Sequence, residues 1–99
     1  MSGAAALVLF ELHLPETRGL KEKRRIVKSL IERLHSRHRV SVAEVGLHDL
    51  HQRSEIGLAL VASSASQAEA LLESLRQTVE LETLGCVISR WSPEVIDFA

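Results

Sequence analysis

Apolar and polar residues alternate from Ala4 to Leu14, near the start of the chain. Val8, Phe10 and Leu12 fall on one side of an extended segment, whereas Glu11 falls on the other side. A period of two residues is typical of a β-strand with one buried face, because successive side chains of a strand point in opposite directions. The pattern therefore predicts a first strand over this segment.

The period changes after a short loop that contains Pro15. From residue 20 to residue 38 apolar residues recur at the spacing of one helix face. These positions are Leu20, Val27, Leu30, Ile31 and Leu34. Gly19 is an acceptable N-cap, and Glu22 lies three residues after it. The segment therefore predicts an amphipathic helix that begins directly after Gly19.

Two further strands are predicted in the middle of the chain. Val40–Val45 is short and rich in β-branched residues, and Gly46 ends it. The polar segment 47–54 reads as a loop, into which the adjoining strands could extend. From Ile56 to Ala62 larger apolar residues again alternate with other residues, which indicates a third strand.

A second helix and a fourth strand complete the pattern. Ser66 followed by Glu69 has the spacing of a capping box at a helix start. The apolar positions that follow at helical spacing are Ala68, Leu71, Leu72, Leu75 and Val79. We therefore expect a helix that runs from Ser66 to near Leu81. Cys86–Trp91 then reads as a strand that ends before Pro93, with a short tail beyond it.

The predicted element order is βαββαβ, within a single domain over residues 1–99. Right-handed crossovers are satisfied most simply by a ferredoxin-like α+β fold, a four-stranded antiparallel sheet with two helices on one face. The opposite face of the sheet would carry both apolar and polar residues, among them Leu7, Leu9, Glu11 and His13. A half-apolar open face of this kind favours a homodimer.

Composition indicates the cellular compartment of the protein. Cys86 is the only cysteine, which excludes an internal disulfide and favours a reducing compartment. The apolar run near the N-terminus meets charged Glu11 too early to span a bilayer. We therefore expect a soluble cytoplasmic protein without a membrane partner. The net charge of −1 by itself indicates neither nucleic acid nor membrane binding.

The distribution of charge is more informative than its total. The segment from Arg18 to Arg39 contains nine basic and two acidic residues. From Ser66 onward the chain contains two basic and six acidic residues. Cations in the first turns of a helix are unfavourable by about 0.3–1 kcal/mol each, because the macrodipole favours anions there. A bound phosphate or carboxylate would relieve this cost. The candidate nucleic-acid or anion-binding residues are Arg18, Lys21, Lys23, Arg24, Arg25 and Lys28.

A solvated helix face explains the same charges without any function. Lys23 falls on the apolar side of the helix and would extend its ammonium group past the sheet edge. The acidic second helix would neutralise the remaining charge. A basic stripe alone is a weak indicator of nucleic-acid binding, so both interpretations stay open.

Two blocks of the chain form a specific pair of motifs. The first is the helix start LKEKR at Leu20–Arg24, and the second lies between Ala43 and Gly57. The second block contains Ala43, Glu44, Val45, Gly46, Asp49, Gln52, Arg53, Ile56 and Gly57. Together the blocks resemble the YlxP-like family of small bacterial proteins, a domain of unknown function. Relatives often carry Trp where this chain has His51, so the packing of this loop is expected to differ.

The resemblance implies a ferredoxin-like fold. Genes of this family often lie among those for translation factors, which implies a connection with the ribosome or with RNA. The family offers no established catalytic residues to carry over to this chain.

The loop between the middle strands holds further candidate ligands. His48, Asp49 and His51 are chemically competent to bind a metal, but three ligands in one polar loop are weak evidence, and we assign no metal site. Glu44, Asp49, Gln52 and Arg53 are better explained as a hydrogen-bonded structural loop or possible pocket, in which Arg53 bridges a carboxylate.

Three functional hypotheses follow. The first is a non-enzymatic module that binds structured RNA, on the ribosome or elsewhere, through the basic first helix. The second is a homodimeric ligand-sensing or enzymatic module, with a small anion at the helix start and the region 44–53 completing a pocket. The third is a protein–protein adaptor that uses the open sheet face. No nucleophile beside a base, paired carboxylates or glycine-rich phosphate loop can be placed, so we assign no catalytic residues and no cofactor.

Overall fold

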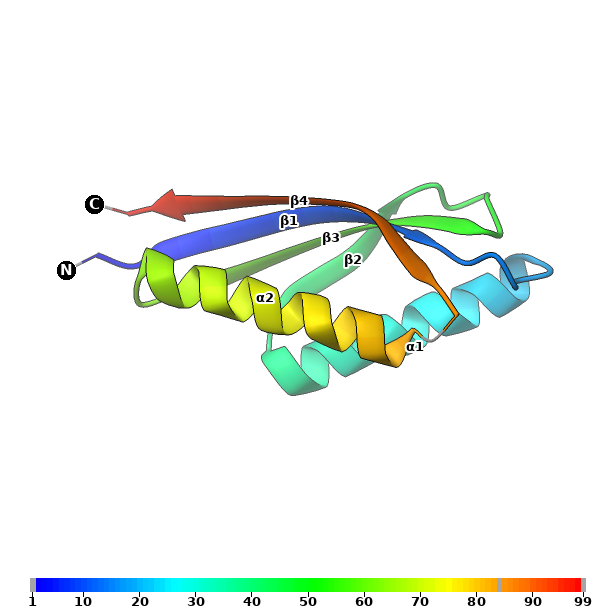
Figure 1. The fold of residues 1–99 in the computed structure, drawn as a ribbon, viewed down its shortest axis with the longest axis horizontal. Coiled ribbons are helices and arrows are strands. Elements are labelled where there is room, and N and C mark those ends of the chain that lie inside the picture. The colour runs from blue at the N-terminus through cyan, green and yellow to red at the C-terminus, as the bar shows by residue number, and fades with distance from the viewer. Residues whose placement is uncertain (1, 84, 99) are drawn as a thin grey trace.

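The computed structural model describes residues 2–83 and 85–98, which form four strands and two helices in the predicted order (Figure 1). The strands are β1 (Ala4–His13), β2 (Ser41–Gly46), β3 (Arg53–Ala62) and β4 (Val87–Asp97). The helices are α1 (Leu20–His38) and α2 (Ala65–Glu82). The strands pair antiparallel in the order β2-β3-β1-β4, so the predicted ferredoxin-like fold is confirmed.

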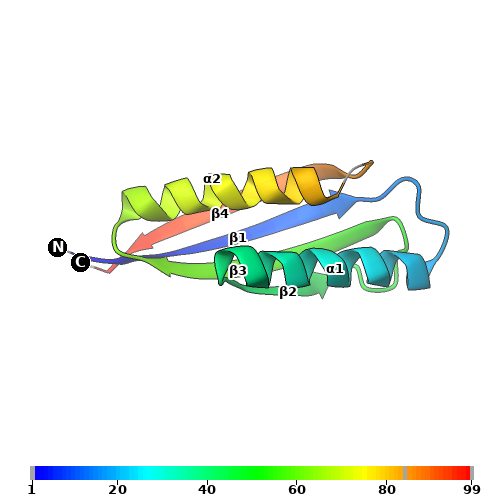
Figure 2. The same ribbon diagram turned by 90° about the horizontal axis from the view of Figure 1, so that it is seen from below.

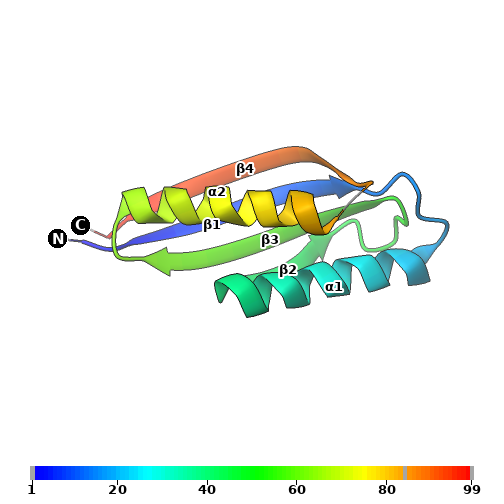
Figure 3. The same cartoon turned by 60° about the horizontal axis from the view of Figure 1, so that its bottom comes forward.

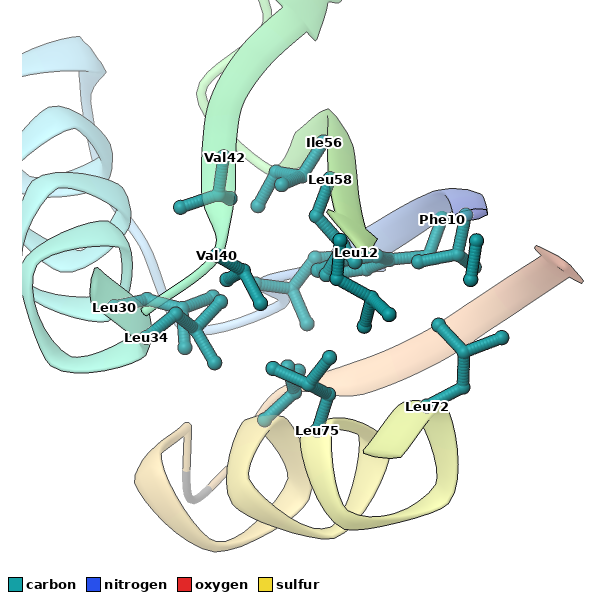
Figure 4. Packing of buried hydrophobic residues seen from close by; sticks show 14 of the residues in the cluster. Phe10, Leu12, Leu30, Leu34, Val40, Val42, Ile56, Leu58, Leu72 and Leu75 are labelled. Atoms are coloured by element: carbon teal, nitrogen blue, oxygen red, sulfur yellow. The ribbon is translucent and has the colours of Figure 1, made fainter. Parts of the chain in front are cut away.

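Both helices cover the same face of the sheet (Figures 2 and 3). Helix α2 packs on β1 and β4, whereas α1 lies beside the edge strand β2 and contacts α2. Alternate residues of β1, including Val8, Phe10 and Leu12, are buried beneath the helices. Leu34 of α1 and Leu75 of α2 meet them in the core that Figure 4 shows. The period-two pattern of β1 therefore marks its core side correctly.

The bounds of α1 agree with the sequence prediction. The helix begins after Gly19, whose carbonyl oxygen accepts a hydrogen bond from the Lys23 backbone N–H at 3.1 Å. It ends at His38, and the C-cap residue Arg39 adopts a left-handed conformation (φ 52°) and donates its N–H to the His35 carbonyl. Val27 and Leu30 face the core, as an amphipathic helix requires.

The start of α2 differs from the prediction. Ser64, not Ser66, is the N-cap, and its hydroxyl accepts a hydrogen bond from the Gln67 backbone N–H at 3.1 Å. The Gln67 side chain in turn accepts the backbone N–H of Ser63 at 2.8 Å. The predicted Ser66–Glu69 capping box was wrong because an equivalent Ser-x-x-Gln pair lies two residues earlier.

Two strands are longer than predicted. Strand β3 begins at Arg53, inside the predicted loop, and β4 continues past Pro93 to Asp97. Pro93 lacks a backbone N–H, but it lies opposite Val8 on an edge strand that needs ladder hydrogen bonds on one side only.

Each edge strand also carries a β-bulge. In β2 the pairing with β3 shifts between Glu44 and Gly46, so that Val45 is the extra residue. In β4 the pairing with β1 shifts at Glu11, and Ser89 is the extra residue. These bulges twist both edges of the sheet locally.

Candidate nucleic-acid interface

Five predicted binding residues form one exposed row along the first half of α1 and the loop before it. We call this row the basic stripe; it consists of Arg18, Lys21, Arg24, Arg25 and Lys28. Helical residues spaced by three, four and seven positions lie on one side of a helix. The four helical members therefore extend over about 10 Å at 1.5 Å per residue. The structure places these four together on the outside of the molecule, and Arg18 is exposed in the loop directly before them.

The sixth predicted residue, Lys23, does not belong to the stripe. Its side chain is fully buried (0% exposed), and its ammonium Nζ lies 2.8 Å from the Glu44 carboxylate. The same ammonium donates to the carbonyl oxygens of Leu47, at 2.8 Å, and His48, at 3.3 Å. Its assignment as a binding residue was wrong because its position on the apolar side of α1 points it inward, where it ties the helix to β2 and the following loop.

Glu44 completes this buried group. Its carboxylate also accepts a hydrogen bond from the Ser54 hydroxyl at 2.6 Å. Burial alone would raise the pKa of Glu44, but the hydrogen bonds from Lys23 and Ser54 and the charge of Lys23 outweigh it and hold the pKa below its ordinary value. The carboxylate is therefore ionised at neutral pH and serves as the counterion of a buried lysine.

Among the described residues, the stripe differs from most other basic residues in that none of its members pairs with a carboxylate. Within residues 2–83 and 85–98, six basic residues form ion pairs: Lys23, Arg33, Arg37, Arg53, Arg76 and Arg90. The chain has twelve Lys and Arg. Five of the six that form no such pair within this described part of the chain belong to the stripe, and the sixth is Arg39.

A shallow groove of about 400 Å³ runs beside the stripe, between α1 and β2. Its lining is mixed: it contains the basic residues Arg24, Lys28 and His35, the acidic residues Glu32 and Glu44, and the apolar residues Val27 and Ile31. Two stripe residues, Arg24 and Lys28, thus line a surface depression.

The loop that carries Arg18 is held by the loop between β2 and β3. The Gln52 side-chain amide donates to the carbonyl oxygens of Pro15 and Thr17, each at 3.3 Å, and the Leu14 backbone N–H donates to the Gln52 carbonyl at 2.8 Å. The buried Thr17 hydroxyl lies against two carbonyls, one from each loop. These contacts hold the backbone of the loop that leads into α1 in one conformation.

The predicted loop residues 44–53 have separate partners. Glu44 binds Lys23, Gln52 binds the loop before α1, and Arg53 lies on the open face of the sheet. Arg53 does bridge a carboxylate, but that carboxylate belongs to Glu11 of β1, at 2.6 Å. Hydrogen bonding from Arg53, with its charge, lowers the pKa of Glu11. Sequence reasoning missed Glu44 as the partner of Lys23 and Glu11 as the partner of Arg53. In each pair the two residues lie on elements that are distant along the chain.

The loop histidines do not form a metal-binding group. Among the described residues, no three His, Cys, Asp or Glu side chains are placed to hold a metal ion together. His48 instead places its Nε2 atom 3.2 Å from the Glu44 carbonyl oxygen. No helix in the described part of the chain is both long and apolar enough to cross a membrane.

Comparison with protein families gives a match over most of the chain. The family described as "Protein of unknown function (DUF503)" matches residues 6–90. The uncharacterized protein YlxP of Bacillus subtilis (strain 168) is 41% identical over 55 residues, which are 56% of this chain and 60% of that relative. The alignment thus spans less than two thirds of the relative. The resemblance inferred from the two motif blocks is confirmed.

Solved structures share the fold at low sequence identity. A C-terminal segment of the alpha subunit of aIF2 from Pyrococcus abyssi matches with a TM-score of 0.51 and 16% identity, over 98% of this chain and 51% of that one. A de novo designed protein with a ferredoxin fold matches with a TM-score of 0.51 and 12% identity, over 100% and 87%. A hydantoinase/carbamoylase family amidase from Burkholderia ambifaria matches with a TM-score of 0.55 and 10% identity, over 98% and 28%. Such similarity establishes the fold alone, because one fold hosts many functions.

Proposed function

We propose a function for this chain, which belongs to the DUF503 family of proteins of unknown function: it is a non-enzymatic module that binds structured RNA through the basic stripe. The observation that carries the proposal is the pairing pattern. The other basic side chains of the described chain are nearly all neutralised by a carboxylate, whereas the five stripe residues are exposed without one. Exposed cations without partners attract anions most strongly.

The length of the stripe favours a polyanion over one small anion. Four cations spread over about 10 Å of helix match a polyanion, because one strand of a duplex carries a charge about every 3.4 Å and the stripe therefore spans several successive phosphates. Lys23, which would have helped to enclose a small anion at the helix start, is turned inward. This arrangement supports the RNA hypothesis over the small-anion hypothesis.

The composition of the stripe favours contacts to the backbone of folded RNA. None of the three aromatic residues, Phe10, Trp91 and Phe98, lies on α1. Stacking of unpaired bases on aromatic rings is therefore not available at the stripe, and phosphate contacts remain. We infer that the stripe positions the protein on structured RNA and reads little base sequence.

The test is RNA binding by two matched variants of the full chain. Lys21→Gln with Lys28→Gln removes two stripe cations, whereas Arg33→Gln with Arg37→Gln removes two cations of the same helix that are paired with Glu82. We would measure binding to a labelled RNA hairpin by fluorescence anisotropy between about 50 and 200 mM salt. The stripe variant should lose affinity, and its salt slope should fall by roughly 0.7–0.9 for each lost phosphate contact.

The control variant should keep most of the wild-type affinity and slope. Equal losses in both variants would mean that net charge, not the stripe, governs binding.

Reversal of Lys21, Arg25 and Lys28 to Glu should abolish binding while the circular dichroism spectrum stays unchanged. Co-sedimentation of the wild-type chain with ribosomal subunits, lost in this reversed variant, would extend the proposal to the ribosome. A wild-type chain that binds no RNA at low salt would overturn it.

A further inference from the structure

The face of the sheet opposite the helices carries exposed apolar side chains. Leu7 is 44% exposed, Val45 51% and Ile96 43%. A shallow groove of about 480 Å³ crosses this face, and all four strands contribute to its lining. An apolar surface that extends over several strands marks a contact site, because monomeric proteins rarely leave such surfaces in water.

Side chains of unequal size give this face a ridge and a furrow. Leu7 and Leu9 of β1 form the ridge, and they lie directly opposite Ala59 and Gly57 of β3. Those two small residues form the floor of the furrow, and Val45 of β2 lines its far side. The ridge and the furrow are therefore adjacent, parallel and matched in position along the strands.

The furrow is not required by the fold of one copy. Gly57 does not adopt a positive φ angle. A Cβ atom built on it would meet the nearest Val45 methyl at 3.4 Å, an ordinary van der Waals contact. Glycine inside a strand weakens the strand and often marks a place where another group approaches closely. Among the described residues, only the two Val45 methyls lie within 4 Å of this Cβ position, so the rest of the space above Gly57 is open to a side chain from outside.

We propose that a second copy of this chain binds this face, with Leu7 and Leu9 of each copy in the furrow of the other. A two-fold axis parallel to the strands and between β1 and β3 exchanges these two strands. Because Leu7 and Ala59 lie at the same level along the sheet, this operation places the ridge of one copy over the furrow of the other. Such an interface is self-complementary, as a closed dimer requires.

The same axis matches the polar residues of the outer strands. Glu94 of β4 lies level with Leu7, and Ser41 of β2 lies level with Ala59. The operation therefore sets the Glu94 carboxylate of one copy opposite the Ser41 hydroxyl of the other, an acceptor facing a donor. Farther along the face, Glu11 and Glu55 already have arginine partners within their own copy.

The size of the face fits a weak dimer. The strand residues cover roughly 600 Å² per copy, from a rise of about 3.3 Å and a strand spacing of about 4.8 Å. Specific interfaces bury about 600–1,000 Å² per partner, so this one lies at the small end. We expect a dissociation constant in the micromolar range. The proposal is independent of RNA binding, because the basic stripe lies on α1, in the helical layer on the other side of the sheet.

Sedimentation equilibrium of the full chain tests the proposal. The wild-type chain should pass from monomer to dimer between about 1 and 300 µM, which brackets the expected dissociation constant. Gly57→Val fills the furrow, suits a strand, and should weaken the dimer by about tenfold or more without lowering the unfolding midpoint. Leu81→Arg is the control, because Leu81 is 70% exposed at the end of α2, away from the open face.

Leu7→Arg provides a second variant if Gly57→Val fails to fold. It places a charge in the ridge at an exposed position and should also give a monomer. A wild-type chain that stays monomeric over the whole range overturns the proposal. So does a dimer that both variants leave intact, or one that the Leu81→Arg control weakens equally.

Discussion

The basic stripe and the bulged end of the open sheet face are both rich in charge, but their charges have different partners. At the bulged end Arg53 and Arg90 lie 2.6 and 2.9 Å from the carboxylates of Glu11 and Glu55. In the stripe no cation has a carboxylate within 4 Å among the described residues. The Arg53–Glu11 pair joins the neighbouring strands β3 and β1, and the Arg90–Glu55 pair reaches across β1 from β4 to β3. Charges without partners remain available to an external anion. The difference shows that the pairing of basic residues is more informative than their number.

Lys23 belongs to the basic segment by sequence, but in the structure it is paired with a carboxylate, unlike the stripe residues around it. Lys23→Met would leave the Glu44 carboxylate, which is only 15% exposed, without its cation. We expect a loss of about 3 kcal/mol or more in the free energy of unfolding, measured by urea denaturation. Lys21→Met is the control, and it should change this free energy by less than about 0.5 kcal/mol.

A double variant separates the cost of leaving one charge unpaired from the cost of changing the packing at this site. Lys23→Met with Glu44→Leu removes both charges, and it should recover most of the stability lost in the single variant. If Lys23→Met were as mild as Lys21→Met, the buried pair would contribute nothing and Lys23 would have to be counted with the stripe.

The acid sensitivity of the protein provides a smaller effect. The folded-state pKa of Glu44 lies below the ordinary value of 4.5, so its contribution to stability is complete above that pH. The contribution is lost as the pH falls through the folded-state pKa, because both states then bind the proton. The stability difference between the wild type and Glu44→Gln should therefore shrink below about pH 4.5. A difference that does not change between pH 7 and pH 3 would contradict the ionised pair.

The smallest expected changes in stability come from removing one cation from each region, Arg90 at the bulged end and Lys21 in the stripe. Arg90→Gln removes a partly exposed ion pair and should destabilise the fold by about 0.5 kcal/mol. Lys21→Gln removes a cation from the first turn of α1 and should stabilise it by about 0.3 kcal/mol, because the helix dipole disfavours that charge. Thermal unfolding at low salt should show the opposite signs, and high salt should reduce both. Destabilisation by Lys21→Gln would show that this lysine has a structural role.

The order of the elements could be predicted because local patterns determine it. The period of two in β1 and the apolar spacing of α1 are set by one buried face, and both agree with the structure. The errors lie where several residues compete for one role. Ser64 and Ser66 both had a suitable partner three residues later, and only the entry of the chain into α2 selects Ser64. Pro93 suggested a strand end, since nothing in the sequence shows that β4 is an edge strand.

The candidate site could be predicted only in part. The charge count of the segment 18–28 pointed to the exposed cations of the stripe, and helical spacing places the four helical ones on one side of α1. Their role in binding stays a prediction. The inward turn of Lys23 was visible in its position on the apolar side, but its partner Glu44 is distant along the chain. The pairing of Arg53 with Glu11 likewise depends on the register between β1 and β3. Sequence periodicity contains no information on such register.

The bulges in β2 and β4 have a consequence for self-association. An open sheet can grow without limit when a flat edge strand accepts a strand from another molecule, which is the route to fibrils. Here Val45 and Ser89 interrupt the ladder at the two edges, and Pro93 removes one hydrogen-bond donor from β4. Strand addition is thereby disfavoured on both sides of the sheet. An apolar face can then remain uncovered at low protein concentration without starting a fibril.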